Sequence, residues 1–359
     1  MLTGWRWLSV ITALVVLLAG CAKKAPAPGG KLAVSLTGAG ATFPYPLYSK
    51  WFDAYAKATD VRINYQSIGS GGGIQQLKAG TVDFGASDAP LSDEETRSMP
   101  APVVHIPTVA GAVVVAYNLP EVRGLRLSGE VLAGIYLGEI TRWSDPKIGA
   151  LNPKARLPNL PIAVAHRADG SGTTYIFTHY LAAVSKAWAD RVGAGKAVNW
   201  PVGLGGKGNE GVTGLVKQTP GGIGYLELAY AKQNNLPYAE MRNAAGKFIE
   251  PTIASTSAAA RGAIAAMKRD VRASLVNSPA PDAYPIAGFT YLLVYRDQTD
   301  RSKGEALAKF LEWAIHDGQK YASPLFYAPL PAEVVALDEA AIRSLRHQGK
   351  PLSLAGRAA

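Results

Sequence analysis

The sequence predicts an α/β protein built of two lobes. Strand-like apolar runs alternate with amphipathic helical segments along the chain, which is the pattern of layered α/β folds. The chain has 359 residues, of which 48% are hydrophobic and 18% are charged, so it can form more than one core. No Pro-, Gly- or Ser-rich linker interrupts the middle of the chain. Composition therefore predicts two lobes without placing the boundary between them.

The N-terminal half shows this alternation in order. A strand-like run at 32–36 leads into glycines, and the segment Pro46–Ala58 has Leu47, Trp51 and Tyr55 on one helical face. The other elements expected in this half are strands at Val61–Tyr65, Val82–Ala86 and Val103–Asn118, a short helix at Ile74–Ala79, and a helix opened by the capping box Ser92-x-x-Glu95.

The C-terminal half continues the pattern. The expected elements are helices at Val131–Gly138 and Thr173–Ala183, strands at Ile162–His166 and Phe289–Tyr295, and a helix at Gly304–Tyr321. The last helix is the most clearly amphipathic, because Leu307, Phe310 and Leu311 share one face with Ala314.

The N-terminus carries the features of an export signal. Arg6 supplies a positive charge, and the uncharged run Leu8–Ala19 is too short to span a bilayer but suits the apolar part of a signal peptide. Leu18-Ala19-Gly20-Cys21 resembles a bacterial lipobox, and Cys21 is the only cysteine of the chain. We expect residues 1–21 to be a lipoprotein signal ending at Cys21, rather than a plain signal peptide followed by an incidental cysteine.

Residues 22–30 read A-K-K-A-P-A-P-G-G and are expected to be a tether between a lipid anchor in the membrane and the folded body. The net charge of +10 favours attraction of anions. A nucleic-acid partner is not expected, because the Lys and Arg residues are scattered and no basic stripe is interleaved with aromatic residues.

Four short stretches place glycines and hydroxyl residues where a helix is expected to begin. They are Thr37–Phe43, Gly69–Gly73, Gly85–Asp88 and Gly170–Thr173. Helix N-termini present unpaired backbone N–H groups and the positive end of the helix dipole, so they attract anions. One such stretch alone is more simply a capped turn. Four of them, with Arg167 close to the last, predict an oxyanion site.

The sequence matches the motifs of enzymes less well than it matches an oxyanion site. Gly85-Ala86-Ser87-Asp88-Ala89 is close to a nucleophile elbow, but Pro90 follows at once, where an elbow requires a helix. Ser171 lacks a nearby base, since His179 is eight residues further along. The five histidines show no metal-binding spacing, and the stretch 203–208 reads as a surface loop. An envelope hydrolase that acts on phosphate esters through Ser87 or Ser171 remains the alternative function.

The same stretches resemble a known family. T-G-A-G-A-T-F-P, I-G-S-G-G-G, V-D-F-G-A-S-D-A-P-L-S-D and R-A-D-G-S-G-T-T are similar, in that order, to motifs of the periplasmic phosphate-binding receptors of bacterial ABC importers. The segments 203–209, 221–225 and 229–236 support the resemblance, which extends from about Leu36 to about Pro331. Gly71 stands where some members have a second serine, and the segment 242–277 and the tail after Pro331 match weakly.

The resemblance implies the two-lobed type II periplasmic binding protein fold, in which each lobe is a β-sheet flanked by helices and the ligand lies in the cleft between lobes. Lobe 1 would comprise residues 31–115 and 287–359, lobe 2 residues 116–286, with two crossover strands as a hinge. The implied function is high-affinity binding of inorganic phosphate and its delivery to an import permease with a cytoplasmic ATPase. The resemblance implies a monomer anchored in the cell envelope, with no catalytic activity, cofactor or metal.

The resemblance also implies a set of phosphate-binding residues. Those expected to donate hydrogen bonds are Thr42, Phe43, Ser70, Arg167, Ser171, Gly172 and Thr173. Asp88 is expected to accept one, and Asp169 is expected to hold the guanidinium of Arg167 without touching the ligand.

Asp88 bears on the identity of the anion. An ionised carboxylate can only accept hydrogen bonds, so it suits an oxyanion that carries a proton, as hydrogen phosphate and dihydrogen phosphate do. Sulfate at neutral pH has no proton and would leave two acceptors facing each other. A receptor of the same fold for sulfate or another ionised oxyanion is the third hypothesis, and Asp88 argues against it.

Overall fold

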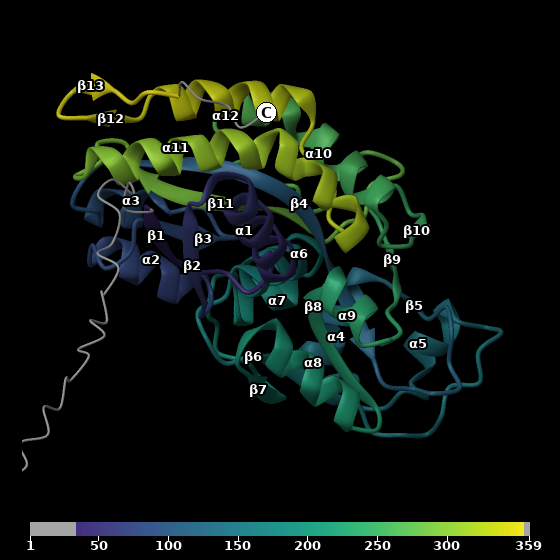
Figure 1. Cartoon of the computed structure of the whole chain (residues 1–359). Helices are drawn as coiled ribbons and strands as arrows, with labels where there is room; N and C mark the ends of the chain where they lie inside the picture. The colour runs from purple at the N-terminus through teal and green to yellow at the C-terminus, as the bar shows by residue number, and fades with distance from the viewer. Residues whose placement is uncertain (1–33, 355–359) are drawn as a thin grey trace, which may run out of the picture. The chain divides into compact units, whose positions relative to one another are not determined.

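The computed structural model describes residues 34–354 (Figure 1). Cys21 and the expected tether at 22–30 lie outside the described residues, so the signal and tether stay predictions. An eight-stranded sheet organises the described chain. Its strand order is β2 (Arg62–Ser67), β1 (Ser35–Gly40), β3 (Phe84–Ser87), β11 (Ala287–Tyr295), β4 (Val103–Tyr117), β8 (Gly222–Glu227), β6 (Ala163–Arg167) and β7 (Leu204–Gly206).

The long strand β4 joins two halves of this sheet. Its residues 103–112 pair with β11 in antiparallel register, and its residues 113–117 pair with β8. On one side, β1 lies parallel to both β2 and β3, and on the other β6 lies parallel to both β7 and β8. The lobe boundary expected after residue 115 falls within β4, and the one expected after 286 falls at the start of β11.

Helices connect the parallel strands, because two parallel neighbours need a crossover connection. The helices are α1 (Tyr45–Thr59), α2 (Ser70–Lys78), α3 (Asp93–Ser98), α4 (Gly129–Tyr136), α5 (Pro146–Leu151), α6 (Gly172–Val184), α7 (Lys186–Arg191), α8 (Gly208–Gln218), α9 (Leu228–Gln233), α10 (Ile253–Met267), α11 (Arg301–Ile315) and α12 (Ala332–Arg343). A small sheet joins β5 (Arg126–Leu127), β9 (Glu240–Arg242) and β10 (Phe248–Ile249), and a terminal pair joins β12 (Arg346–His347) and β13 (Lys350–Pro351).

The α/β class and most of the expected elements are confirmed. The capping box at α3 is present in full, since the Ser92 hydroxyl accepts from the Glu95 N–H and the Glu95 carboxylate accepts from the Ser92 N–H. The helix expected at Gly304–Tyr321 ends at Ile315 and continues as a 3-10 turn over Asp317–Tyr321. The Trp51 indole N–H donates to the carbonyl of Gly318 in this turn, at 2.7 Å, and so ties it to α1.

Two sequence interpretations are wrong. Gly85–Asp88 does not begin a helix, because Gly85–Ser87 belong to the buried strand β3 and the next helix starts at Asp93. The stretch 203–208 is not simply a surface loop. Leu204 is exposed, but residues 204–206 pair with β6 and α8 begins at Gly208, which is buried.

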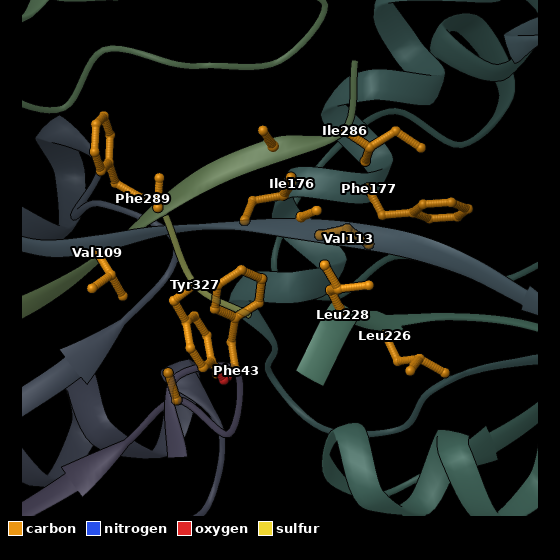
Figure 2. Packing of buried hydrophobic residues seen from close by; sticks show 14 of the residues in the cluster. Phe43, Val109, Val113, Ile176, Phe177, Leu226, Leu228, Ile286, Phe289 and Tyr327 are labelled. Atoms are coloured by element: carbon orange, nitrogen blue, oxygen red, sulfur yellow. The ribbon is translucent and has the colours of Figure 1, made fainter. Parts of the chain in front are cut away.

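The core runs continuously along β4. Val109 and Val113 of this strand lie in the same cluster of buried side chains, although one precedes and the other follows the exchange of pairing partner (Figure 2). Phe43, which follows β1, packs edge-on against the ring of Tyr327, with ring centres 6.4 Å apart. Within residues 34–354, no helix has the length and apolar character needed to cross a membrane.

Candidate functional site

The guanidinium of Arg167 is buried and held in a fixed orientation at the end of β6. Its Nε donates to Asp169 Oδ1 at 2.7 Å and its Nη2 donates to Oδ2 at 2.5 Å, which is the pairing expected from the sequence. Burial opposes the charge of Asp169, yet its contacts with Arg167 lower the pKa of that carboxyl overall. Asp169 also accepts from the Gly208 N–H, so it connects β6 to the start of α8.

The start of α6 presents the next group of predicted residues. Ser171 is the N-cap, and its hydroxyl accepts from the Thr174 N–H at 3.0 Å. The Thr173 hydroxyl accepts from Nη1 of Arg167 at 3.3 Å, so the guanidinium lies at this helix N-terminus. The arrangement combines a fixed positive charge with the positive end of a helix dipole.

Gly172 lies where two parts of the chain meet. Its N–H donates to the Ser70 hydroxyl at 3.0 Å, across 102 residues of sequence. A Cβ at this position would lie 2.6 Å from Asp88 Oδ2 and 2.6 Å from Ser70 Oγ. Only glycine therefore lets the α6 backbone approach Ser70 and Asp88 this closely.

Ser70 and Asp88 lie side by side although the sequence separates them. The fully buried Ser70 hydroxyl accepts from the Asp88 N–H at 3.3 Å as well as from Gly172. The Asp88 side chain is 3% exposed, and its Oδ1 accepts from the Thr290 hydroxyl on β11 at 2.8 Å. Burial raises the pKa of Asp88 to about 7, against the lowering effects of the Thr290 hydrogen bond, the Arg167 charge and Ser70.

Thr42 and Phe43 form the other wall of the site, in the loop between β1 and α1. Their carbonyl oxygens are occupied: Tyr230 donates to that of Thr42 at 2.6 Å, and Tyr327 donates to that of Phe43 at 2.7 Å. Among the hydrogen bonds of residues 34–354, none has the backbone N–H of Thr42, Phe43 or Thr173 as its donor. These N–H groups are available to an anion.

The structure therefore brings together every residue of the predicted site. Thr42, Phe43, Ser70 and Asp88 come from the N-terminal part of the chain, and Arg167, Ser171, Gly172 and Thr173 come from the middle. Direct hydrogen bonds connect the two groups, since Gly172 donates to Ser70 and the Gly71 N–H donates to the carbonyl of Gly170 at 2.8 Å.

Sequence reasoning missed Asn209, Thr290 and Glu227 as parts of this region. Asn209 is fully buried, and its amide donates to both Thr42 and Thr173. A signal for it is present, because it follows glycines at the start of a helix, but the stretch before it has the composition of a loop. Thr290 lies in a long apolar strand and gives no signal of its own.

Glu227 is fully buried at the end of β8. One of its oxygens accepts from the Ala229 N–H at the start of α9, and the other has no hydrogen-bond partner within residues 34–354. Burial raises the pKa of this carboxyl well above its usual value. Burial therefore favours the protonated, neutral form of the Glu227 side chain.

The serines weighed as nucleophiles are occupied in other ways. The Ser87 hydroxyl accepts from the Ala89 N–H and donates to the Ala89 carbonyl. Ser171 caps α6, and the His179 ring packs against Tyr175 with ring centres 4.0 Å apart. Within residues 34–354, no group of three or more His, Cys, Asp or Glu side chains is placed to hold a metal ion.

Comparisons with known proteins identify the family of this chain. Residues 25–317 match the model of the PBP superfamily domain. The chain is 47% identical over 306 residues to the phosphate-binding protein PstS of Haemophilus influenzae, covering 84% of this chain and 90% of the relative. It is 45% identical over 305 residues to the phosphate-binding protein PstS of Pasteurella multocida, covering 84% and 88%.

Solved structures share the fold. The phosphate-binding protein of Stenotrophomonas maltophilia aligns with a TM-score of 0.68 at 21% identity, covering 86% of this chain and 94% of its own. An ABC-type phosphate transport receptor from Vibrio cholerae aligns with a TM-score of 0.53 at 20% identity, covering 82% and 100%. These likenesses confirm the two-lobed fold of type II periplasmic binding proteins.

Proposed function

The chain belongs to the PstS phosphate-binding proteins of the PBP superfamily, and on this premise we propose that it binds inorganic phosphate and delivers it to an ABC-type import permease. The ligand would lie between Thr42, Phe43, Ser70 and Asp88 on one side and Arg167, Ser171, Gly172 and Thr173 on the other. Asp169 would act through Arg167, by holding the Nε and Nη2 edge of the guanidinium in place.

The observation that carries this proposal is that one hydrogen-bond acceptor, Asp88, lies among several hydrogen-bond donors. The backbone N–H groups of Thr42, Phe43 and Thr173 and the guanidinium of Arg167 suit the unprotonated oxygens of an anion. Asp88 lies next to Ser70 and Gly172 and suits an oxygen that carries a proton. Phosphate near neutral pH has oxygens of both kinds.

Little net charge is needed to bind the anion. Arg167 is paired with Asp169, so the anion is held chiefly by backbone and hydroxyl dipoles and by the N-termini of α2 and α6. No metal or cofactor takes part in this scheme. The enzyme alternative receives no support from the site, because within residues 34–354 neither Ser87 nor Ser171 has a base beside it.

The lobes would close around the ligand about β4 and β11. In this proposal lobe 1 comprises residues 31–115 and 287–359 and lobe 2 comprises residues 116–286, since β4 changes its pairing partner at residues 112 and 113. A ligand that touches both lobes stabilises the closed arrangement by its differential affinity for it.

The place of action is proposed as the cell envelope. The relatives are named as PstS phosphate-binding proteins, and a lipid on Cys21 would hold this chain at the membrane near its permease. The tether at 22–30 would give the folded body reach toward the permease. The protein would act as a monomer, with a cytoplasmic ATPase driving the transport step.

Calorimetric titration of the purified protein with phosphate tests the proposal. We expect saturable binding of one phosphate per chain, and Arg167→Gln should weaken it by at least about a hundredfold through loss of charge-assisted hydrogen bonds. The matched control is Arg126→Gln, whose exposed pair with Glu240 lies outside the site and should leave affinity unchanged. Absence of phosphate binding, or turnover of a phosphate ester that Ser171→Ala abolishes, would overturn the proposal.

A further inference from the structure

Asn209 occupies a central position that none of the predicted contacts explains. It lies in the first turn of α8, is fully buried, and contacts Thr42 on one side of the site and Thr173 on the other. The inference drawn from it rests on the proposed phosphate-binding function.

The orientation of the Asn209 amide is fixed by its surroundings. Its Oδ1 accepts from the Glu227 backbone N–H at 2.9 Å, which directs its Nδ2 toward the site. That Nδ2 donates to Thr42 Oγ1 at 2.7 Å and to Thr173 Oγ1 at 3.1 Å. The carbonyl of Asn209 accepts from the Thr213 hydroxyl at 2.7 Å, which holds the backbone at the same place.

Asn209, together with Arg167 at Thr173, uses up the acceptor capacity of both hydroxyls. A threonine hydroxyl has two lone pairs and one proton. Thr42 Oγ1 accepts from both the backbone N–H of Asn209, at 3.1 Å, and its Nδ2. Thr173 Oγ1 accepts from Nδ2 of Asn209 and from Nη1 of Arg167, at 3.3 Å. Each hydroxyl can therefore only donate a further hydrogen bond, through its proton.

We propose that Asn209 is a positioning residue that fixes the Thr42 and Thr173 hydroxyls as hydrogen-bond donors toward the anion. Without it, either hydroxyl could rotate and present a lone pair to an approaching oxygen. With it, both present protons, and Asp88 remains the acceptor for the protonated oxygen. Asn209 therefore acts on ligand orientation as well as on affinity.

A double-mutant cycle for phosphate binding tests this role. Asn209→Ala should weaken binding about tenfold, and Thr42→Val should do so by a similar factor, because each removes one donor or its orientation. If Asn209 acts through the Thr42 hydroxyl, the double variant should bind nearly as well as Thr42→Val alone. In the same cycle with Thr173→Val, the affinity lost by the double variant should again be smaller than the product of the two single losses. Strict multiplication of the two losses in both cycles would overturn the inference.

Two further variants separate orientation from packing. Asn209→Leu keeps the branching and the number of side-chain heavy atoms but has no donor, so it should weaken binding as much as the alanine variant does. It replaces the alanine variant if that variant does not fold. Asn243 is a matched buried asparagine, whose Nδ2 donates to the carbonyls of Pro281 and Ala283, and Asn243→Ala should lower thermal stability without changing phosphate affinity.

The outcomes distinguish this inference from the proposed function. If the unaltered protein binds no phosphate, the proposed function fails and the inference falls with it. If the unaltered protein binds phosphate and Asn209→Leu binds equally well, the function stands and the role of Asn209 is contradicted.

Discussion

Asp88 is buried at 3% exposure beside the Ser70 hydroxyl, and burial raises its pKa to about 7. The sequence predicts an ionised acceptor at this position. In the structure it is divided between its charged and neutral forms near neutral pH, because the Thr290 and Arg167 contacts offset only part of the cost of burial. A ligand that brings its own proton allows the ionised form to be kept.

The buried carboxyl of Asp88 makes the stability of the ligand-free protein depend on pH. Its pKa is higher in the folded chain than the ordinary 3.8, so the folded state binds more protons and the free energy of unfolding falls as pH rises from about 4 to about 7. The variant Asp88→Asn lacks this loss and should therefore be more stable than the unaltered protein above that range, by up to about 4 kcal/mol.

Denaturant unfolding of both proteins across this pH range measures the effect. The two curves should converge at acid pH, where the carboxyl is protonated in both states. A variant that is less stable than the unaltered protein at all pH values would show that burial of Asp88 is not costly.

Asp338 on α12 is a second carboxyl whose burial costs folding free energy, and the proposed function does not explain why it is buried. It is fully buried, neither carboxylate oxygen has a partner within residues 34–354, and burial raises its pKa well above the ordinary value. Asp338→Leu should raise the free energy of unfolding by about 2 kcal/mol at neutral pH, because it removes an unpaired buried polar group. Chemical denaturation checks this, with the exposed Glu333→Gln on the same helix as a control that should change little.

At the scale of elements, local pattern predicted helix starts where the chain supplies a cap. Ser92, Ser171 and the stretch Gly69–Gly73 mark the starts of three helices correctly. Gly85–Asp88 has the same composition but forms the end of a strand, because Gly85 and Ala86 pair with both β1 and β11. The glycine at 85 allows α2 to pack closely on β3, since a Cβ there would lie 3.2 Å from the carbonyl oxygen of Gly73, and composition does not distinguish this from a turn.

Helix α3 makes ion pairs between the two proposed lobes. Glu95 pairs with Lys196 at 2.7 Å, and Asp93 pairs with Arg272 at 2.9 Å. The carbonyl of Lys196 also accepts from the Ser171 N–H, so this pair is directly connected to the site. Burial opposes the charge of Glu95, but Lys196 and the Ser92 N–H lower its pKa overall.

Glu95→Gln should weaken phosphate binding about two- to fivefold, since it removes a partly exposed ion pair between the two proposed lobes. Glutamine still serves the capping box with Ser92, so α3 itself should remain intact. Calorimetry at low and high salt measures the change, which should shrink as salt screens the pair.

The matched control for that variant is Glu305→Gln. It breaks an exposed pair with Arg301 inside α11, remote from the lobe contact, and should leave phosphate affinity unchanged. Equal losses in both variants would show that the α3 pair has no particular role in closure.

At the scale of the whole molecule, the site depends on contacts that local sequence does not reveal. Thr290 and Asp88 are 202 residues apart, and Asn209 and Thr42 are 167 apart. These pairs meet because β11 returns to lie between β3 and β4, and because α8 begins beside the end of β6. The resemblance supplied the residues proposed to touch the ligand, but finding the residues that hydrogen-bond to them, Thr290 and Asn209, required the fold.

The central claim is that Asp88, one hydrogen-bond acceptor among donors, selects an oxyanion that carries a proton. The phosphate-to-sulfate selectivity of the Asp88→Asn variant tests this claim most directly. Competitive titration should show that the unaltered protein binds phosphate and discriminates strongly against sulfate. The variant should lose about a hundredfold of that selectivity, because an amide can donate to an unprotonated oxygen. Equal selectivity in the two proteins would contradict the claim.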